Sequence, residues 1–438
     1  MESSFEFLRF VQSKDLSFWD VKTYSCKSVC SQFVVIKLKD YLTEQNKKEK
    51  LFKYPNKYFK ILGVNNQNGL FDAYEEQGKN INQPYKKVED GWFAYNPYRV
   101  NVGSIGLKSA QQNNEYISPA YVVFSCKNAL LPDYLNVIIK TKFFNEAIKA
   151  NTTGSVRQTL GFNNLCNIEI PLPSIERQKE LVAQYNALLN WAKDKENQAD
   201  TMEQSIDDYL MAKLGIKANL PSTNNSLFQT VEYKNLDKWG KIVNSQNFGT
   251  FFDVIPFADI VTEGPFYGAN VKGSNINNGC RYVRITDIKD DGSLNNDIVY
   301  PEVVDNRYLL QENDFLIARS GATVGKTFLY KTSYGKCIFA GYLVRYRINS
   351  NVNPMYLLYY TQASPYKKWV KITQRVAAQP NINGQEYLKF PFVFPPLDIQ
   401  NQIVEEITLR KKQIKNLREE SEKLRSQALS DFEKEVFN

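Results

Sequence analysis

The chain contains the same short segment twice. Residues 173–178 (Pro-Ser-Ile-Glu-Arg-Gln) return as residues 395–400 (Pro-Pro-Leu-Asp-Ile-Gln), and each copy leads into a long charged stretch with a heptad pattern. Further pairs at offsets between 219 and 222 are Trp19 with Trp239, Tyr134 with Tyr356, Gly106 with Gly325, and Tyr121 with Tyr342. A chance match would not keep one offset, and a period near 220 is far longer than a solenoid repeat. We therefore expect two tandem copies of one unit, with two similar functional sites.

The two charged stretches carry apolar residues at alternating steps of four and three, which is typical of a coiled-coil helix. Each stretch of about 40 residues would extend about 60 Å as a helix. A lone helix with an exposed apolar seam is unstable in water, so we expect the two helices to pack on each other. They should be antiparallel because a domain intervenes; the alternative is that each helix folds back on its own domain. The residues expected in this packing are Leu181, Tyr185, Leu188, Met202, Ile206, Ile403, Ile407, Ile414, Leu417 and Leu424.

Each globular unit has the pattern of a mixed α/β domain, in which short β-branched and aromatic runs alternate with turns. The expected strands are 92–95 and 121–124 in the first unit and 315–318, 327–330 and 342–347 in the second, with helices at 134–150 and 355–373. The predicted fold class is α+β: two tandem mixed α/β domains separated by two long antiparallel coiled-coil helices, a pseudo-twofold internal repeat. The expected boundaries are 1–170 for the first domain, 171–216 for the first helix, 217–232 for a linker, 233–394 for the second domain and 395–438 for the second helix.

Composition argues against catalysis by this chain. It has no histidine, which removes Ser-His-Asp and Cys-His nucleophile systems and the commonest general base. The six cysteines form no CxxC pair, so we expect reduced thiols and no metal site. The N-terminus shows no secretory signal pattern, and no window approaches 18 apolar residues, which predicts a cytoplasmic protein without a membrane partner. A net charge of +8 with 27 tyrosines and 27 phenylalanines suits nucleic acid.

Residues 320–327 (Ser-Gly-Ala-Thr-Val-Gly-Lys-Thr) resemble a phosphate-binding P-loop. The first glycine of GxxxxGK[ST] is missing at Ser320, and a strand is expected where a P-loop needs a helix. We therefore expect a hairpin turn, which still allows close approach to a DNA phosphate.

Polar side chains gather in the expected loops of both units. Arginine pairs bidentately with guanine in the major groove, and asparagine or glutamine with adenine, although ordinary surface loops contain the same residues. The candidate DNA-binding residues are Arg99, Asn101, Lys108, Arg157 and Gln158 in the first unit, and Lys272, Asn275, Asn277, Arg281, Arg319, Ser320, Thr323, Lys326, Arg375 and Gln379 in the second.

The repeated segments resemble those of specificity subunits of type I restriction-modification systems. The residues that carry the resemblance are 170–178 and 394–400, each opening a long helix, together with Trp19, Trp239, 118–121 and 319–325. The resemblance extends over essentially the whole chain. The glycine turn of the first unit, residues 101–106, lacks the Arg-Ser-Gly lead of the second, so the two units should read different half-sites.

The resemblance implies a non-catalytic subunit whose two target-recognition domains each read half of a bipartite double-stranded DNA sequence. The helices would act as spacer and as docking surface for two DNA adenine methyltransferase subunits, which would bind S-adenosylmethionine. A separate restriction motor-nuclease would bring ATP- and Mg-dependent cleavage, so no cofactor is expected on this chain. Two alternatives stay open: a related system whose partner fuses methylase and nuclease, and a coiled-coil scaffold that does not bind DNA.

Overall fold

The computed structural model describes residues 29–66, 69–99, 103–127, 129–152, 159–216, 249–374 and 380–437. The chain divides into two compact units. Unit 1 consists of residues 1–196 and 419–438, and unit 2 of residues 197–418. Trp19, Trp239 and the expected linker at 217–232 lie outside the described residues.

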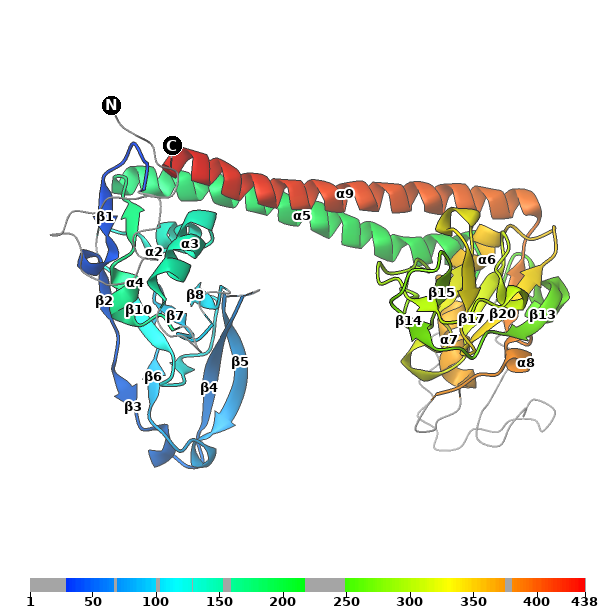
Figure 1. Ribbon diagram of the computed structural model, residues 1–438, viewed down its shortest axis with the longest axis horizontal. Helices are drawn as coiled ribbons and strands as arrows, with labels where there is room; N and C mark the ends of the chain where they lie inside the picture. Colours follow the sequence, from blue (N-terminus) through cyan, green and yellow to red (C-terminus); the bar gives the residue numbers. More distant parts are fainter. Residues whose placement is uncertain are drawn as a thin grey trace. The chain divides into compact units, whose positions relative to one another are not determined.

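Unit 1 is built on a four-stranded antiparallel sheet in the order β2-β10-β7-β8, with a two-stranded sheet β1-β11 beside it (Figure 1). Three helices follow the sheet along the chain. The elements are β1 (Val35–Lys37), β2 (Leu42–Glu44), β7 (Phe93–Tyr95), β8 (Ile105–Leu107), β10 (Val122–Cys126), α2 (Pro132–Ile138), α3 (Lys142–Asn151), α4 (Phe162–Cys166) and β11 (Glu169–Pro171).

Unit 2 repeats this order, with an antiparallel sheet β13-β20-β17-β18 and the pair β12-β21. The elements are β12 (Asp253–Pro256), β13 (Val261–Tyr267), β17 (Phe315–Ala318), β18 (Thr327–Leu329), β20 (Leu343–Ile348), α6 (Pro354–Gln362), α7 (Ser364–Thr373), α8 (Gly384–Tyr387) and β21 (Pro391–Phe394). From β7 onward, each element of unit 1 has its counterpart 222 positions later, within two residues at the ends. The predicted duplication and mixed α/β class are thus confirmed.

Between the first and second strands of the shared sheet, each unit carries an insert of its own. In unit 1 the insert forms most of a five-stranded sheet β3-β6-β9-β4-β5. In unit 2 it contributes to two small sheets, β14-β16 and β15-β19. Their bounds are β3 (Lys48–Glu49), β4 (Tyr58–Asn65), β5 (Gly69–Gln77), β6 (Tyr85–Lys87), β9 (Tyr116–Ile117), β14 (Gly273–Ser274), β15 (Arg281–Val283), β16 (Tyr300–Pro301) and β19 (Cys337–Phe339).

The single helix expected in each domain is in fact two. Residues 355–373 form α6 and α7, which are separated at Ala363, and Pro365 starts the second helix. Proline lacks the N–H that would continue the first helix, but its fixed φ suits a helix start. Residues 134–150 form α2 and α3, where the Thr141 hydroxyl accepts a hydrogen bond from Phe144 N and caps the second helix. Proline and threonine therefore break these two segments where the apolar pattern runs on.

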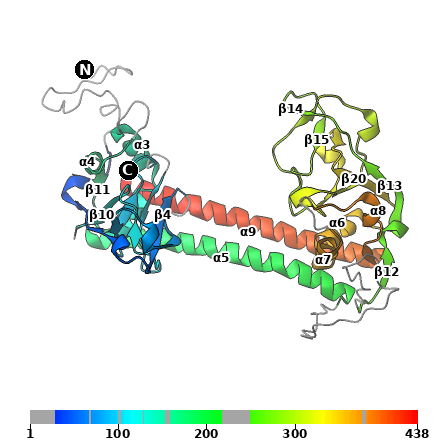
Figure 2. The ribbon, with the colours of Figure 1, turned by 90° about the horizontal axis from the view of Figure 1, so that it is seen from below.

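The two long helices are α5 (Ile175–Leu214) and α9 (Leu397–Phe437), and both ribbon views show them side by side (Figures 1 and 2). In unit 1, Arg177 pairs with Glu435 at 2.6 Å, and further along Ser421 Oγ donates to Ala192 O over 2.8 Å. In unit 2, Arg418 pairs with Asp200 at 3.2 Å, and Arg410 Nη1 donates to Ser205 O over 3.2 Å. Because residue numbers rise along one helix as they fall along the other, the pair is antiparallel, as predicted.

The residues predicted to pack in this seam are all buried or half-buried. The fully buried ones are Leu181, Tyr185, Ile403, Ile407 and Ile414, and the half-buried ones are Leu188, Met202, Ile206, Leu417 and Leu424. The core of unit 1 contains the start of α5 and, from α9, Phe432 and Val436. The core of unit 2 contains the start of α9 and, from α5, Leu210 and Leu214. The alternative that each helix packs on its own domain alone is therefore wrong.

The repeated glutamine explains why the same segment opens both helices. Gln178 is fully buried; its Oε1 accepts from Leu131 N, and its Nε2 donates to the carbonyls of Ala129 and Pro173, at 2.9–3.0 Å. Gln400 makes the matching three bonds, to Asn353 N and to the carbonyls of Asn351 and Pro395, at 2.8–3.1 Å. Every partner is displaced by 222 positions. A buried side-chain amide thus satisfies backbone groups that would otherwise lack partners, and it ties α2 or α6 to the long helix.

Two of the expected landmark pairs are wrong. Gly103 and Gly325, 222 positions apart, share a left-handed φ of 87° and 85°, whereas Gly106 lies inside β8, where a Cβ would come within 2.1 Å of Leu70 N. Tyr121 was expected to match Tyr342. However, Tyr121 N bonds to Ser118 O just as Leu343 N bonds to Ala340 O. Tyr121 therefore corresponds to Leu343, and the counterpart of Tyr342 is Ala120.

Candidate nucleic-acid interface

In unit 2 the clearest constellation lies where β17 ends. The main chain of Arg319 is held on both sides: its N–H donates to Tyr342 O and its carbonyl accepts from Ile382 N, both at 3.0 Å. In unit 1 the equivalent bond runs from Leu160 N to Pro97 O, so Pro97 occupies the place of Arg319. α8, which follows Ile382, lies on the side of unit 2 away from α9 (Figure 1).

The Arg319 guanidinium lies between two tyrosine rings. Its centre is 5.0 Å from the Tyr267 ring and 5.9 Å from the Tyr342 ring, distances at which a cation is attracted to an aromatic face. Both rings remain partly open to solvent, at 39% and 54%. The Tyr267 hydroxyl accepts a hydrogen bond from Gly384 N at 3.1 Å, which fixes one ring against α8. This site presents one cation and two aromatic rings at the end of the sheet.

The glycine-containing turn that follows is a hairpin, as predicted. Gly321–Thr323 form a single turn, and strand β18 begins at Thr327 where a P-loop would start its helix. Ser320 is buried, and its hydroxyl has no partner among the described residues, while the Thr323 hydroxyl donates to Ser320 O at 3.3 Å. Lys326 Nζ lies 2.9 Å from the exposed carboxylate of Asp290. Lys326 is therefore the residue of this turn that brings a charged group to the surface.

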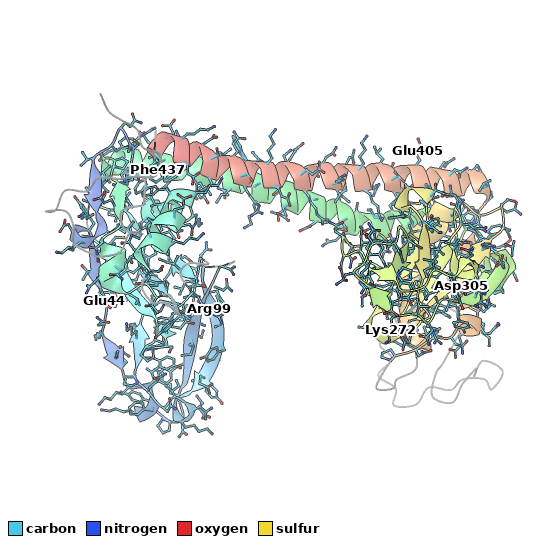
Figure 3. The ribbon with its side chains drawn as sticks, in the orientation of Figure 1. Glu44, Arg99, Lys272, Asp305, Glu405 and Phe437 are labelled. Atoms are coloured by element: carbon cyan, nitrogen blue, oxygen red, sulfur yellow. The ribbon has the colours of Figure 1, made fainter. Side chains whose placement is uncertain are left out.

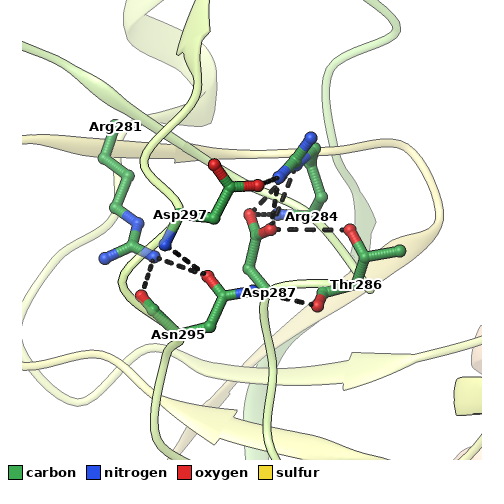
Figure 4. A network of polar contacts seen from close by, with 6 residues as sticks. All are labelled: Arg281, Arg284, Thr286, Asp287, Asn295 and Asp297. Carbon is green, nitrogen blue, oxygen red and sulfur yellow. Dashed lines mark hydrogen bonds and ion pairs between the residues drawn. The ribbon is translucent and has the colours of Figure 1, made fainter. Parts of the chain in front are cut away.

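The other candidates of unit 2 lie in its insert. Lys272 (Figure 3) and Asn275 are exposed, and the Asn277 carboxamide accepts from Gly279 N at 2.9 Å. Arg281 Nη2 donates to the carbonyl of Asn295 at 2.7 Å, as Figure 4 shows, and its buried Nε has no partner in the part of the chain that the structure describes. These residues present a cation and amide groups on one loop, with Arg281 partly committed to holding that loop.

A second arginine in Figure 4 is structural. Arg284 Nη2 lies 2.7 Å from Asp287, whose side chain is fully buried, and 3.1 Å from Asp297. The hydrogen bond with Asp287 is the main cause that raises the pKa of Arg284. Because carboxylates occupy its donors, Arg284 stabilises the insert and is not among the groups open to a ligand.

Of the candidates of unit 1, the structure describes Arg99 and Lys108, which differ in exposure. Arg99 is exposed after β7 (Figure 3), beside Tyr98, which is 58% exposed. Lys108 is buried, with 7% of its side chain exposed, and its ammonium lies 2.6 Å from Asp90. Five further candidates lie outside the described residues: Asn101, Arg157 and Gln158 of unit 1, and Arg375 and Gln379 of unit 2.

Sequence reasoning missed the two tyrosines beside Arg319. Tyr267 ends β13 and Tyr342 precedes β20, and they meet at Arg319 because β20 pairs with both β13 and β17. A strand order of this kind is not encoded in local sequence. Tyr342 follows a glycine and precedes a strand, which marks a turn but not what the ring contacts.

Further observations limit the chemistry. The described residues contain no group of three or more His, Cys, Asp or Glu side chains that could hold a metal ion. Within the same part of the chain, no helix has the length and apolarity needed to cross a membrane. The cysteines that are described, Cys30, Cys126, Cys166, Cys280 and Cys337, carry free thiols.

Comparisons with known proteins agree with this geometry. The family model described as "Type I restriction modification DNA specificity domain" matches residues 265–425. The specificity subunit of the type I restriction enzyme StySPI from Salmonella potsdam is 22% identical over 388 residues, which cover 82% of this chain and 77% of that protein.

A solved structure shows the same fold. A chain from work on complex assembly and conformational transition of the type I R-M system superposes with a TM-score of 0.60 at 15% identity, over 94% of this chain and 98% of that one. An HsdS subunit from Thermoanaerobacter tengcongensis gives a TM-score of 0.47 at 15% identity, over 95% and 99% of the two chains.

Proposed function

We propose that this chain is a DNA specificity subunit of a type I restriction-modification system, and that its two units read the two halves of a split double-stranded DNA target. Each half would be read by the loops at the strand ends of one unit and by the insert beside them. The candidate contacts are Arg99 in unit 1 and Lys272, Asn275, Asn277, Arg281, Arg319, Thr323 and Lys326 in unit 2.

The observation that carries this proposal is a duplicated scaffold with unlike surfaces. The buried junctions at Gln178 and Gln400 match bond for bond at one offset. The positions at the end of the shared sheet differ, with Pro97 and Ala120 in unit 1 against Arg319 and Tyr342 in unit 2. Side chains that differ in hydrogen-bonding groups select different base pairs. Two related units with unlike surfaces suit an asymmetric bipartite sequence.

Partner subunits would supply the chemistry. We propose that two DNA adenine methyltransferase subunits bind the helix pair and carry S-adenosylmethionine, and that a motor-nuclease subunit carries ATP and Mg. The complex would work in the cytoplasm. In this arrangement the helices act as the spacer that sets the unspecified gap between half-sites, so removing one heptad from each helix should change the gap and leave both half-sites intact.

The helix pair of unit 1 offers a candidate docking groove of about 450 Å³. Trp191 lies at its edge with 59% of its surface exposed, and Leu188 and Phe432 line it. Exposed aromatic residues of this kind are enriched among the residues that dominate protein interfaces. We propose that a methyltransferase subunit covers Trp191, so Trp191→Ala should weaken copurification with that subunit.

The test is genome-wide mapping of adenine methylation in cells with and without this gene, with the partner methyltransferase present in both. Loss of one split motif on deletion supports the proposal and yields both half-sites. An unchanged methylation pattern contradicts it. A scaffold without a DNA role also predicts no salt-sensitive DNA binding by the assembled complex, whereas phosphate contacts require affinity to fall steeply as salt rises.

A further inference from the structure

The side chain of Arg319 is held in place, and no carboxylate within the described residues neutralises it. Two aromatic rings flank its guanidinium, and hydrogen bonds fix its backbone on both sides. A free surface arginine loses rotamer freedom when it binds a ligand, whereas a stacked one has already lost it. Arg319 is therefore pre-organised for a partner that approaches its edge.

The terminal nitrogens are the part of Arg319 that remains open to such a partner. Its Nε is buried and makes no hydrogen bond within the described residues, and two tyrosine rings lie 5.0 and 5.9 Å from the centre of its guanidinium. No carboxylate within the described residues forms an ion pair with it, whereas Arg281, Arg284 and Arg307 each have an oxygen acceptor within 2.7 Å. What remains is the planar pair of N–H donors at the end of the side chain.

Resting on the function proposed above, we propose that Arg319 reads a guanine in the half-site of unit 2. Its terminal N–H groups would donate to O6 and N7 of the base in the major groove, the usual bidentate pairing of arginine with guanine. A phosphate contact fixes position without reading sequence, so an anchor of that kind would serve both units equally. Unit 1 instead has Pro97 and Ala120 at the positions of Arg319 and Tyr342. We therefore expect the contact with guanine in the half-site of unit 2 and not in the half-site of unit 1.

The test compares methylation motifs for the wild-type chain, Arg319→Lys and Arg319→Gln, each expressed with its methyltransferase partner. Lysine keeps the charge but lacks the planar fork. Both variants should accept other bases at one G·C pair of one half-site, because discrimination there falls about 5- to 150-fold. The other half-site should stay unchanged. Arg307→Lys is the matched control: Arg307 is also an arginine over a tyrosine ring, but it pairs with Asp305, and its substitution should leave the motif intact.

A second variant covers the case in which Arg319 substitutions prevent assembly. Tyr342→Ala removes one ring, and the shared scaffold already accommodates alanine at the equivalent position, Ala120. This variant should lower discrimination between bases at the same G·C pair, but by a smaller factor than the Arg319 variants. An unchanged motif in all three variants overturns the proposal, as does a uniform loss of methylation at an unchanged motif, which would indicate a phosphate contact. Failure of the proposed function itself looks different, because gene deletion would then leave methylation unaltered.

Discussion

The two units share a scaffold and differ in what is inserted into it. The strand orders β2-β10-β7-β8 and β13-β20-β17-β18 are the same. The inserts at 45–92 and 268–314 are of similar length but fold into different sheets. Both inserts attach in one way, since β4 pairs with β9, and β15 with β19, in parallel. A fixed attachment with a variable insert lets surface chemistry change without disturbing the domain core.

The largest difference inside the shared sheets is electrostatic. Unit 2 buries Asp314 and Arg345, with 1% and 5% of their side chains exposed, in a network that includes Glu263 and Arg347. The residues 222 positions earlier are Trp92 and Val123, which belong to an apolar cluster. One unit thus fixes its sheet with ion pairs at a place where the other uses apolar packing.

We expect the largest effect from Asp314→Ala, which should destabilise unit 2 and leave unit 1 unchanged. Removing Asp314 leaves the buried Arg345 and the partly buried Arg347 with Glu263 alone as their carboxylate partner. Loss of one partner from a buried ion pair typically costs about 3–5 kcal/mol, and Glu263 should offset part of that cost. Hydrogen exchange should show weakened protection in β17 and β20, with β7 and β10 of unit 1 unchanged. Asp305→Ala, which breaks an ion pair with the exposed Arg307, is the control and should leave the protection of both units unchanged, because exposed ion pairs contribute little to stability. Equal loss of protection in both units would contradict the assignment.

The glutamine junctions should respond alike in the two units. Gln178→Leu and Gln400→Leu each remove three hydrogen bonds and leave a backbone N–H without its partner, at about 1–3 kcal/mol per unsatisfied buried group. We expect each substitution to cost about 3 kcal/mol in its own unit, measured by hydrogen exchange of α2 and α6. Gln184→Leu on the exposed face of α5 serves as the control. A large effect in one unit alone would show that the junctions are not equivalent.

The sequence was sufficient where the pattern repeats or has a period. The duplication, the antiparallel helix pair and the strands 315–318 and 327–330 follow from the offset and from apolar spacing. The pairing of Gly106 with Gly325 failed because turns are matched by backbone conformation, and Gly103 is the residue with positive φ. The candidate site was found only in part: Arg319 stood out as an arginine before a glycine turn, but Tyr267 reaches it through strand pairing between distant segments. The environment of Lys108 depends on a contact with Asp90 in another loop, which local composition does not reveal.

Two lysines sharpen the comparison of surfaces. Lys272 is exposed. If it contacts a phosphate, one counterion is released from the DNA. Lys272→Ala should therefore lower the slope of log affinity against log salt by about 1 for DNA binding of the assembled complex. Lys108→Ala should leave the slope unchanged because its ammonium is bound to Asp90; it should instead destabilise unit 1. An equal change of slope for both lysines would mean that Lys108 leaves Asp90 when DNA binds.

We expect the smallest effect at two polar residues of the helix seam, Ser421 and Arg410. Ser421 is buried in unit 1 and donates to Ala192 O, while Arg410 in unit 2 lies 4.6 Å over the Tyr209 ring and donates to Ser205 O. Ser421→Ala removes a donor from a carbonyl that can keep its helical hydrogen bond, so the cost should be at most about 1 kcal/mol. Arg410→Ala should cost a similar amount, about 0.5–1 kcal/mol, through the lost cation–π contact. Amide exchange in α5 near Ala192 and near Ser205 separates the two effects. A loss above about 3 kcal/mol at Ser421 would show that its hydroxyl specifies the seam rather than merely filling it.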